Sequence, residues 1–484
     1  MADRSANPST TGRKPGPARP PAGRPPQPGR TSASGRATRP PATRRRSAAP
    51  AAGEGPLHDV LVVGGGPGGA SCAYWLAEAG WDVALVEKKR FPREKTCGDG
   101  LTPRSVRQLA DMGVDLAGAH RHHGLRAMGF GRALEMPWPD HPVFPSYGYT
   151  ITRHDLDGLV AERAAKAGAT VWQGTEAVEP LTTAPPAETG PGAGGLPVCH
   201  GATVRDRDTG ATRQIRARYV VVADGSNSRF GRALGTARDR SRPLGMALRG
   251  YFRSPRHDDD FIESHLDIRD HAGEVVPGYG WIFPLGDGRV NVGVGLLSTD
   301  QRWKGVNTTQ LMEAFVHWAP RSWGITPETA CGTPTGGKLP MGLSVGPRYG
   351  PNTVVVGDAG GTVNPFNGEG IAYAYETGRL AAATLGEALA GAGPGALAGY
   401  ERRLEEAYRT YYAVARGFVR LISNPRTMRL CVSTGMHSEL LMSQLLRIMA
   451  NLMRPDTAGA AEIGYRALQV AGRLLHGAVP EPQP

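Results

Sequence analysis

A glycine-rich turn at residues 64–69, set between two apolar segments, constrains the fold of this chain more than any other feature. Residues 58–63 (HDVLVV) form a short apolar run typical of a buried parallel strand, and residues 70–80 (ASCAYWLAEAG) have helical periodicity and end in glycine. A second buried strand is expected at residues 82–88 (DVALVEK). Strand, turn, helix and strand in this order predict a βαβ unit that opens a Rossmann-type sheet.

The same unit carries the residues of a dinucleotide site. Gly64, Gly66 and Gly69 match G-x-G-x-x-G, a spacing that permits a tight turn, close approach of a pyrophosphate and close packing of helix on strand. The helix N-terminus offers free N–H groups and a positive dipole end to phosphates. Glu87 follows Gly69 by 18 residues, where a carboxylate can accept hydrogen bonds from ribose hydroxyls. Because the chain holds 67 glycines, the order of the elements predicts the site more strongly than the glycines alone.

Two later segments indicate which dinucleotide is bound. Residues 220–235 (VVVADGSNSRFGRALG) are typical of a strand that ends at Asp224, and residues 352–378 of a strand that ends at Asp358, a turn, and a helix that begins around Gly370. Both resemble the flavin-monooxygenase-like FAD fold of the aromatic hydroxylases. That resemblance implies that Asp358 contacts the ribityl chain and that the helix N-terminus faces the flavin, where its dipole stabilises the reduced ring. An ordinary helix cap is the alternative for Asp358.

Three further segments narrow the resemblance. Residues 91–106 (FPREKTCGDGLTPRSV), 279–284 (YGWIFP) and 364–371 (NPFNGEGI) are similar to the geranylgeranyl reductase family, and within it to the menaquinone reductases that saturate an isoprene unit of the quinone tail. In that family Y-x-W-x-F-P is followed by G-x-G, and here eight residues separate Pro284 from the G-x-G at 293–295. The resemblance covers about residues 59–420.

The resemblance also implies the site residues. Carried over position by position, the FAD contacts are Gly68, Glu87, Cys97, Gly98, Gly100, Arg153, Ala177, Asp358, Gly370 and Ile371. Gly64, Gly66, Gly69 and Asp224 complete the predicted cofactor site. Arg153 begins RHDLDGLV and offers a cation for the cofactor's phosphates. No metal site is predicted.

Cys97 is the candidate catalytic residue, and four others are candidates for substrate binding. Cys97 lies in a Cys-Gly-Asp-Gly turn that in the family runs beside the flavin, where the thiol would shape the pocket or relay a proton. Tyr279, Trp281, Phe283 and Pro284 would line an apolar tunnel for a prenyl chain. Strand alternation puts the three aromatic residues on one face, which ordinary strand packing explains equally well.

The implied reaction is reduction of an isolated alkene by hydride from reduced FAD, with menaquinone's prenyl tail as the expected substrate. Geranylgeranyl diphosphate or a geranylgeranyl lipid is the alternative substrate, and a flavin-dependent monooxygenase or halogenase is the alternative enzyme on the same fold. Because the sequence holds no second complete dinucleotide fingerprint, the electron donor stays open between NAD(P)H, a ferredoxin and a quinol.

The N-terminal segment explains the charge of the chain. Residues 1–52 hold ten arginines and one lysine against one acid, whereas the remainder carries 45 basic and 43 acidic residues. Of the net charge of +12, +10 therefore belongs to the tail and +2 to the remainder, and no nucleic-acid partner is expected. Residues 1–55 are expected to be disordered: a solvated extension, a wrongly assigned start or a tether to anionic lipid. A non-catalytic membrane- or nucleic-acid-binding protein driven by this tail is the rival of another class.

Cysteine usage and hydropathy bear on localisation. Five scattered cysteines without C-x-x-C spacing suit a reducing cytoplasm. No apolar run approaches the roughly 20 residues that span a bilayer, and the basic start lacks the apolar stretch of a signal peptide. Leu and Met recur at helical spacing in residues 438–454, a pattern that fits a membrane interface or a core or subunit contact. We expect a cytoplasmic protein, with peripheral contact at the inner face of the cell membrane left open.

The predicted architecture is α/β: a Rossmann-type FAD-binding domain of the flavin-monooxygenase-like fold, an interleaved β-sheet substrate domain and a helical C-terminal region. The FAD-binding domain is expected to be discontinuous, over residues 56–180, 215–240 and 350–390. The substrate domain is expected at 241–349 and the helical region at 391–484, with a loop insertion at 182–195.

Overall fold

The structure is a computed structural model, and it describes residues 56–183, 195–276, 278–298, 305–422, 425–454, 459, 462–463 and 465. The predicted tail at residues 1–55 and most of the predicted loop at 182–195 lie outside the described residues. Within the described part of the chain, no helix is both long enough and apolar enough to cross a membrane.

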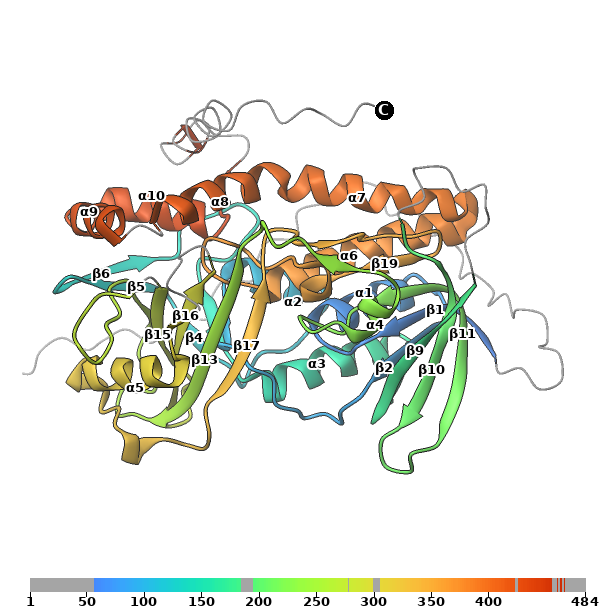
Figure 1. The fold of residues 1–484 in the computed structure, drawn as a ribbon, viewed down its shortest axis with the longest axis horizontal. Coiled ribbons are helices and arrows are strands. Elements are labelled where there is room, and N and C mark those ends of the chain that lie inside the picture. The colour runs from blue at the N-terminus through green and yellow to red at the C-terminus, as the bar shows by residue number, and fades with distance from the viewer. Residues whose placement is uncertain are drawn as a thin grey trace, which may run out of the picture. The chain divides into compact units, whose positions relative to one another are not determined.

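A seven-stranded sheet forms the first part of the fold (Figure 1). Its order is β8 (Thr170–Gln173), β2 (Val83–Glu87), β1 (Leu57–Val63), β11 (Thr212–Val222), β10 (Val198–Asp206) and β9 (Thr175–Thr183), with β19 (Thr353–Val355) also paired to β11. Strands β8, β2, β1, β11 and β19 run parallel, whereas β10 and β9 add an antiparallel meander. The predicted βαβ unit is confirmed.

Helices cover one face of this sheet. Val60 and Val62 of β1 pack with α1 (Pro67–Glu78), α3 (Arg153–Lys166) and α6 (Ile371–Glu387), while Leu61 and Val63 point to the opposite face. Successive side chains of a strand point to opposite faces. All four of these residues are buried, so β1 is enclosed on both sides as parallel strands require. On the opposite face, apolar side chains of β1, β2, β10, β11 and β19 pack together with Phe230 of α4 (Arg229–Ala233).

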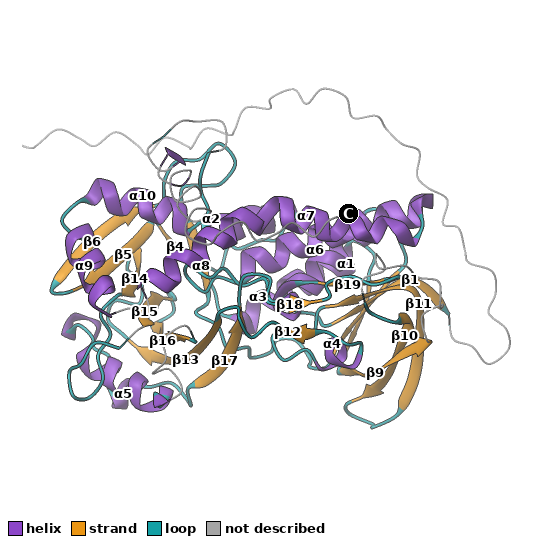
Figure 2. Cartoon of the chain, turned by 45° about the horizontal axis from the view of Figure 1, so that its top comes forward, coloured by secondary structure: helices purple, strands orange, loops and turns teal. Residues whose placement is uncertain are grey.

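A second seven-stranded sheet lies beside the first (Figures 1 and 2). Its order is β17 (Thr335–Pro340), β13 (Leu244–Arg253), β16 (Arg289–Leu297), β15 (Gly278–Pro284), β14 (Phe261–His265), β5 (Gly124–Gly129) and β6 (Arg132–Pro137). Helix α5 (Thr308–Trp318) buries Leu311, Met312 and Phe315 against this sheet.

The second sheet draws strands from two distant parts of the sequence. Strands β5 and β6 fall inside the 56–180 segment assigned to the first domain, yet β5 pairs in parallel with β14. Conversely, β10 and the last three residues of β9 extend the first sheet through residues outside the predicted domain segments. Local periodicity identifies a strand but not its partner, because pairing is decided by long-range contacts. The domain boundaries therefore stay a prediction.

The C-terminal region is helical through the described residues, and it passes over both sheets (Figure 1). Its helices are α7 (Ala398–Leu404), α8 (Thr410–Ile422), α9 (Pro425–Gly435) and α10 (Glu439–Met449). Helices α9 and α10 pack on β5, β6 and β14 through Val432, Met442 and Leu446.

The remaining elements are short. They are α2 (Pro103–Asp111), β3 (Gly100–Leu101), β4 (His120–His122), β7 (Gly148–Thr150), β12 (Ala237–Arg238), β18 (Val345–Gly346), η2 (Arg321–Trp323), η3 (Pro327–Thr329), η4 (Gly357–Gly360), η5 (Ala388–Ala392), η6 (Pro394–Leu397) and η7 (Glu405–Arg409).

Candidate active site

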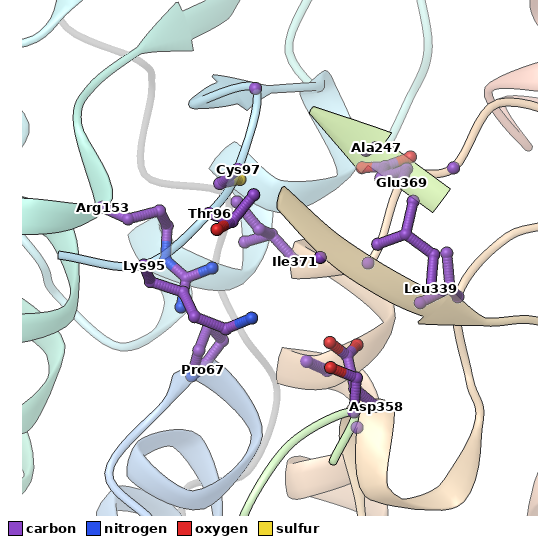
Figure 3. Close-up of a pocket in the computed structure, with 18 of the residues that line it drawn as sticks. Pro67, Lys95, Thr96, Cys97, Arg153, Ala247, Leu339, Asp358, Glu369 and Ile371 are labelled. Atoms are coloured by element: carbon purple, nitrogen blue, oxygen red, sulfur yellow. The ribbon is translucent and has the colours of Figure 1, made fainter. Parts of the chain in front are cut away.

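A cavity of about 1120 Å³ is lined by residues of both sheets, of α6 and of the C-terminal helices. All of the predicted site residues line it except Gly69 and Pro284. Figure 3 shows Cys97 and Arg153 on one side of the opening and Asp358 and Glu369 on the other. The structure thus brings together residues that lie more than 250 positions apart in the sequence.

The glycine turn forms one wall of this cavity, and its glycines are required by close backbone contacts. Gly64 has φ +107°, and a Cβ there would lie 2.4 Å from the carbonyl oxygen of Ala223. A Cβ on Gly69 would lie 1.9 Å from the carbonyl oxygen of Gly64, so Gly69 allows α1 to pack and does not itself face the cavity. Gly66 is the N-cap of α1 and provides no side chain to cap it. The first N–H groups of α1 are thereby left for an anion.

Charged residues surround this turn in a buried network. The Glu87 carboxylate accepts hydrogen bonds from the backbone N–H of Gly65 (2.9 Å) and of Lys89 (3.0 Å). Arg93 Nη2 lies 3.0 Å from Asp157 Oδ2 and 3.5 Å from Glu87 Oε2. A Cβ on Gly66 would lie 3.7 Å from Arg93 Nη2. Arg93, which the sequence analysis missed, therefore places a cation against the turn.

Arg153 is engaged within the protein. Its Nε and Nη2 each donate to the Asp157 carboxylate at 2.7 Å, and Arg153 is buried. In this i, i+4 pair on α3, Asp157 binds the guanidinium group of Arg153, which the sequence analysis assigned to phosphate binding. The phosphate role of Arg153 stays a prediction.

The Cys-Gly-Asp-Gly turn is held by a buried carboxylate that the sequence analysis also missed. Asp99, at φ +65°, accepts hydrogen bonds from the Tyr251 hydroxyl (2.7 Å), Asn291 Nδ2 (2.8 Å) and the backbone N–H of Arg153 (3.1 Å). Burial raises the pKa of Asp99 to about 6 although these donors oppose it. Burial likewise raises the pKa of the Cys97 thiol, so Cys97 is a thiol and not a thiolate near neutral pH.

Three aromatic side chains of β15 form a second wall. The ring centroids of Tyr279 and Trp281 are 5.7 Å apart, and those of Trp281 and Phe283 are 6.3 Å apart. Each of the three lines the cavity, as strand alternation predicts. Trp281 Nε1 donates to Asn291 Oδ1 at 2.9 Å, which fixes the indole ring.

Glycines make room for these rings. Gly293 pairs with Trp281 across the strands, and a Cβ on it would lie 2.1 Å from Trp281 Cζ2. Gly295 pairs with Tyr279, where a Cβ would lie 3.2 Å from Tyr279 Cε1. A Cβ on Gly100 would lie 3.0 Å from Phe283 Cε2. The G-x-G spacing after the aromatic pattern is therefore explained by two rings that lie over adjacent backbone.

The N-terminus of α6 forms the third wall. Gly370 is its N-cap without a side-chain cap, and Asp358 lies beside it, with Oδ1 at 3.3 Å from the position of a Cβ on Gly370. In the described part of the chain no hydrogen bond to the Asp358 carboxylate is found, whereas Asp224 accepts from Ser228 Oγ (2.5 Å) and the backbone N–H of Phe230 (2.9 Å). Asp358 is thus open toward the cavity, whereas Asp224 is bonded to the N-terminus of α4, whose N-cap is Ser228. The cofactor role of Asp224 stays a prediction.

Beyond the aromatic wall the cavity continues into an apolar end. Side chains from β5, β6, β14 and the C-terminal helices line it: Leu125, Ala127, Met136, Trp138, Ile262, Leu266, Phe418, Met428, Val432, Met442, Leu445 and Leu446. The sequence analysis did not identify this end, because its side chains come from segments that are joined only by the fold.

Comparison with known proteins shows the family of this chain. A family model described as FAD binding domain matches residues 58–278. The menaquinone reductase of Mycolicibacterium smegmatis is 38% identical over 87% of this chain and 98% of its own length. Digeranylgeranylglycerophospholipid reductase 1 of Methanopyrus kandleri is 30% identical over 74% of this chain and 88% of its own length. This chain belongs to the geranylgeranyl reductase family of FAD-dependent oxidoreductases.

A solved structure agrees with the fold of this reductase. The geranylgeranyl bacteriochlorophyll reductase-like protein of Thermoplasma acidophilum superposes with a TM-score of 0.65 at 23% identity, over 85% of this chain and 96% of that one. At this identity the likeness concerns the fold alone. The predicted α/β fold and the predicted FAD-binding fold are confirmed.

The reductase uses FAD, and its residues fit that cofactor. The uncapped N-terminus of α1 and Arg93 suit the pyrophosphate, and Glu87 suits the adenosine ribose. The open carboxylate of Asp358 suits the ribityl hydroxyls, and the uncapped N-terminus of α6 suits a flavin ring that becomes negative on reduction. These assignments to single residues are predictions.

Proposed function

We propose that this reductase saturates a carbon–carbon double bond in the isoprenoid tail of menaquinone. The observation that carries the proposal is the apolar end of the cavity, which continues directly from the aromatic wall of Tyr279, Trp281 and Phe283. An isoprenoid chain is apolar throughout, and such a tunnel desolvates it without leaving buried polar groups unpaired. The identity to a menaquinone reductase over nearly the whole of that protein supports the same substrate class.

The contribution of the protein to this reaction is position. FAD, once reduced, supplies the hydride for one alkene carbon. The rigid aromatic wall orients an unactivated double bond that offers no polar handle, and the apolar lining excludes water from it. Trp281 is held by Asn291, and Asn291 Nδ2 also donates to the carbonyl oxygen of Cys97 (2.9 Å). The aromatic wall and the Cys97 turn are therefore joined through Asn291.

The rival monooxygenase or halogenase activity on this fold receives less support. Flavin hydroxylases and reductases share the nucleotide half, so the fold does not separate them. The relatives at 38% and 30% identity are named as a menaquinone reductase and a digeranylgeranylglycerophospholipid reductase. We therefore propose a net gain of two hydrogens by the lipid, with no gain of oxygen or halogen.

Purified enzyme reduced with dithionite tests this function. It would be incubated without oxygen with menaquinone in detergent and, separately, with geranylgeranyl diphosphate, and the lipids analysed by mass spectrometry. Because dithionite also reduces the quinone ring, the ring would be reoxidised before analysis, and we then expect menaquinone to keep a gain of two mass units per reduced bond of its tail. Saturation of geranylgeranyl diphosphate alone would reassign the substrate, and gain of an oxygen or halogen in air would establish the rival chemistry.

We further propose that α9 and α10 contact the membrane in which the quinone resides. Leu430, Leu440 and Leu441 are 66%, 70% and 54% exposed, while Val432 and Met442 on the same two helices line the apolar end of the cavity. Arg429 on α9 is also exposed, and cations favour anionic headgroups. This arrangement would let a prenyl tail pass from the bilayer to the cavity without entering water.

The electron donor is proposed to be an external reductant: NAD(P)H, a ferredoxin or a quinol. Each candidate would be mixed anaerobically with the oxidised holoenzyme while the flavin absorbance is followed. The donor is the one that bleaches the flavin at a rate no slower than lipid saturation under turnover.

A further inference from the structure

Glu369 is a carboxyl group on the cavity wall whose surroundings differ from those of every neighbouring acid. It lies one residue before the N-cap of α6, in the loop between η4 and α6, and it lines the cavity. Its Oε1 accepts hydrogen bonds from Thr102 Oγ1 and from Ser105 Oγ (3.3 Å). Its Oε2 is buried and has no hydrogen-bond partner in the described part of the chain. One oxygen is therefore stabilised as an acceptor, and the other can carry a proton.

The nearest cation is occupied by a different carboxylate. Arg104 of α2 contacts Glu376 through Nε (2.6 Å) and Nη2 (3.0 Å), and Tyr408 donates to the same carboxylate at 2.6 Å. Among the residues that the structure describes, Glu369 therefore forms no ion pair, and the Glu376 charge disfavours a second negative charge nearby. Tyr373 on α6 and Tyr411 on α8 also face it as neutral hydroxyls, because burial raises the pKa of both phenols.

These surroundings set the protonation of Glu369. Burial raises its pKa to about 7, against the opposing effect of Thr102 and Arg104. A large fraction of the molecules therefore holds a neutral carboxylic acid at this position near neutral pH.

The loop that carries Glu369 is tied to the substrate wall. The Tyr279 hydroxyl donates to the carbonyl oxygen of Asn367 at 2.9 Å, and the backbone N–H of Glu369 donates to Asn367 Oδ1 at 3.0 Å. Asn364 Nδ2 anchors the same loop to the carbonyl oxygen of Met449 at 3.1 Å. Glu369 is therefore held between the aromatic wall and the N-terminus of α6.

We propose that Glu369 is the general acid of the reduction and donates its carboxyl proton to the alkene carbon that does not receive hydride. This inference rests on the proposed function. The carbon–carbon π bond breaks and two C–H bonds form, one with the hydride supplied by reduced FAD and one with the carboxyl proton. Both electrons come from the reduced cofactor. Glu369 is left as a carboxylate, which the hydroxyls of Thr102 and Ser105 stabilise until water returns a proton.

Three other proton-bearing groups on the cavity wall are less suited to this step. Asp99 accepts three hydrogen bonds, two on Oδ2 and one on Oδ1, so it is held as an acceptor. Burial raises the pKa of Tyr279 to about 12, and its hydroxyl hydrogen is engaged in the hydrogen bond to the carbonyl oxygen of Asn367. Burial also raises the pKa of Cys97. General acids work best when their pKa lies near the working pH, which favours Glu369.

The test is single-turnover saturation of menaquinone by dithionite-reduced holoenzyme between about pH 5.5 and about pH 8.5. Wild type is compared with Glu369→Gln, Glu369→Asp and the control Glu387→Gln, an exposed carboxylate at the far end of α6 that pairs with Arg403. We expect the wild-type rate to fall as pH rises through about 7, because the acid form is lost. Glu369→Gln should retain FAD, react about 100-fold more slowly and lose this pH dependence. Glu369→Asp should be slowed less and should keep the fall with pH.

The outcomes separate the two proposals. If wild type saturates neither menaquinone nor geranylgeranyl diphosphate, the proposed function and this inference are both overturned. If wild type is active and Glu369→Gln matches it in rate and pH profile, only the role of Glu369 is overturned. A slow Glu369→Gln enzyme whose rate still falls through the wild-type pH range also overturns it, because the titrating acid would then be another group.

Discussion

The two ends of the cavity are built in different ways. At the end predicted to bind the nucleotide, the lining groups come largely from short motifs: the turn at 64–69, Glu87 at the end of β2, and Asp358 beside α6. At the apolar end, the lining comes from three strands and three helices that are widely separated in sequence, and each contributes one to three of the apolar side chains. A charged ligand needs backbone N–H groups and charges in a fixed geometry, which a short motif can encode. An apolar chain needs only a contiguous apolar surface, which many sequences can supply.

The largest expected effect is at the nucleotide end. Gly69→Ala would place a Cβ 1.9 Å from the carbonyl oxygen of Gly64, so the turn must open. We expect FAD affinity to fall by about 100-fold, since such overpacking costs about 1–3 kcal/mol. Flavin-to-protein ratio after purification and titration with FAD measure the loss. Gly118→Ala is the matched control, because a Cβ there meets nothing within 4 Å; a Gly69→Ala protein as yellow as this control would refute the packing argument.

The next prediction tests whether the aromatic wall can be altered without loss of FAD binding. Gly293→Ala would put a Cβ 2.1 Å from Trp281 Cζ2, whereas Gly295→Ala puts one 3.2 Å from Tyr279 Cε1. Gly293→Ala should keep FAD and lower the rate of lipid saturation by about 10-fold, because the ring that positions the alkene is displaced. Gly295→Ala should stay near wild type. Equal rates for the two variants would show that ring position does not limit the reaction.

A smaller effect is expected at the outer surface of the apolar end. The double variant Leu440→Ser, Leu441→Ser removes two exposed apolar side chains from α10. Co-flotation with vesicles that contain anionic lipid should fall by about 5-fold, because interfacial binding scales with buried apolar area. FAD content should not change. Flotation equal to wild type would remove α10 from the membrane contact.

The smallest effect concerns Glu369, where the two ends meet. Its pKa is raised from 4.5 to about 7 in the folded protein, so the unfolded state ionises first and the fold loses stability as pH rises between these values. Glu369→Gln removes this loss. The melting temperature of the Glu369→Gln variant should equal that of wild type at about pH 4.5 and exceed it by about 2 °C at about pH 8. Calorimetry of the two holoenzymes measures this difference. A difference that is equal at both pH values would show that Glu369 does not titrate in this range.

The contrast between the ends also explains which parts of the site could be predicted. The turn, Glu87 and the aromatic face were predicted because glycine spacing and strand alternation are local properties. Arg93 and Asp99 were missed although they flank predicted residues. Their roles depend on burial and on partners such as Asp157 and Asn291, which are brought close only by folding.

The sequence by itself determined the βαβ unit, the FAD motifs and the family of this protein, because each depends on residue order over a few turns or strands. Only the tertiary structure decided that β5 and β6 join the second sheet, that α8, α9 and α10 close the apolar end, and that Arg104 pairs with Glu376 and not with Glu369. The physical reason is that strand pairing, burial and the pKa of a carboxyl group depend on neighbours in space, and those neighbours lie up to hundreds of residues away along the chain.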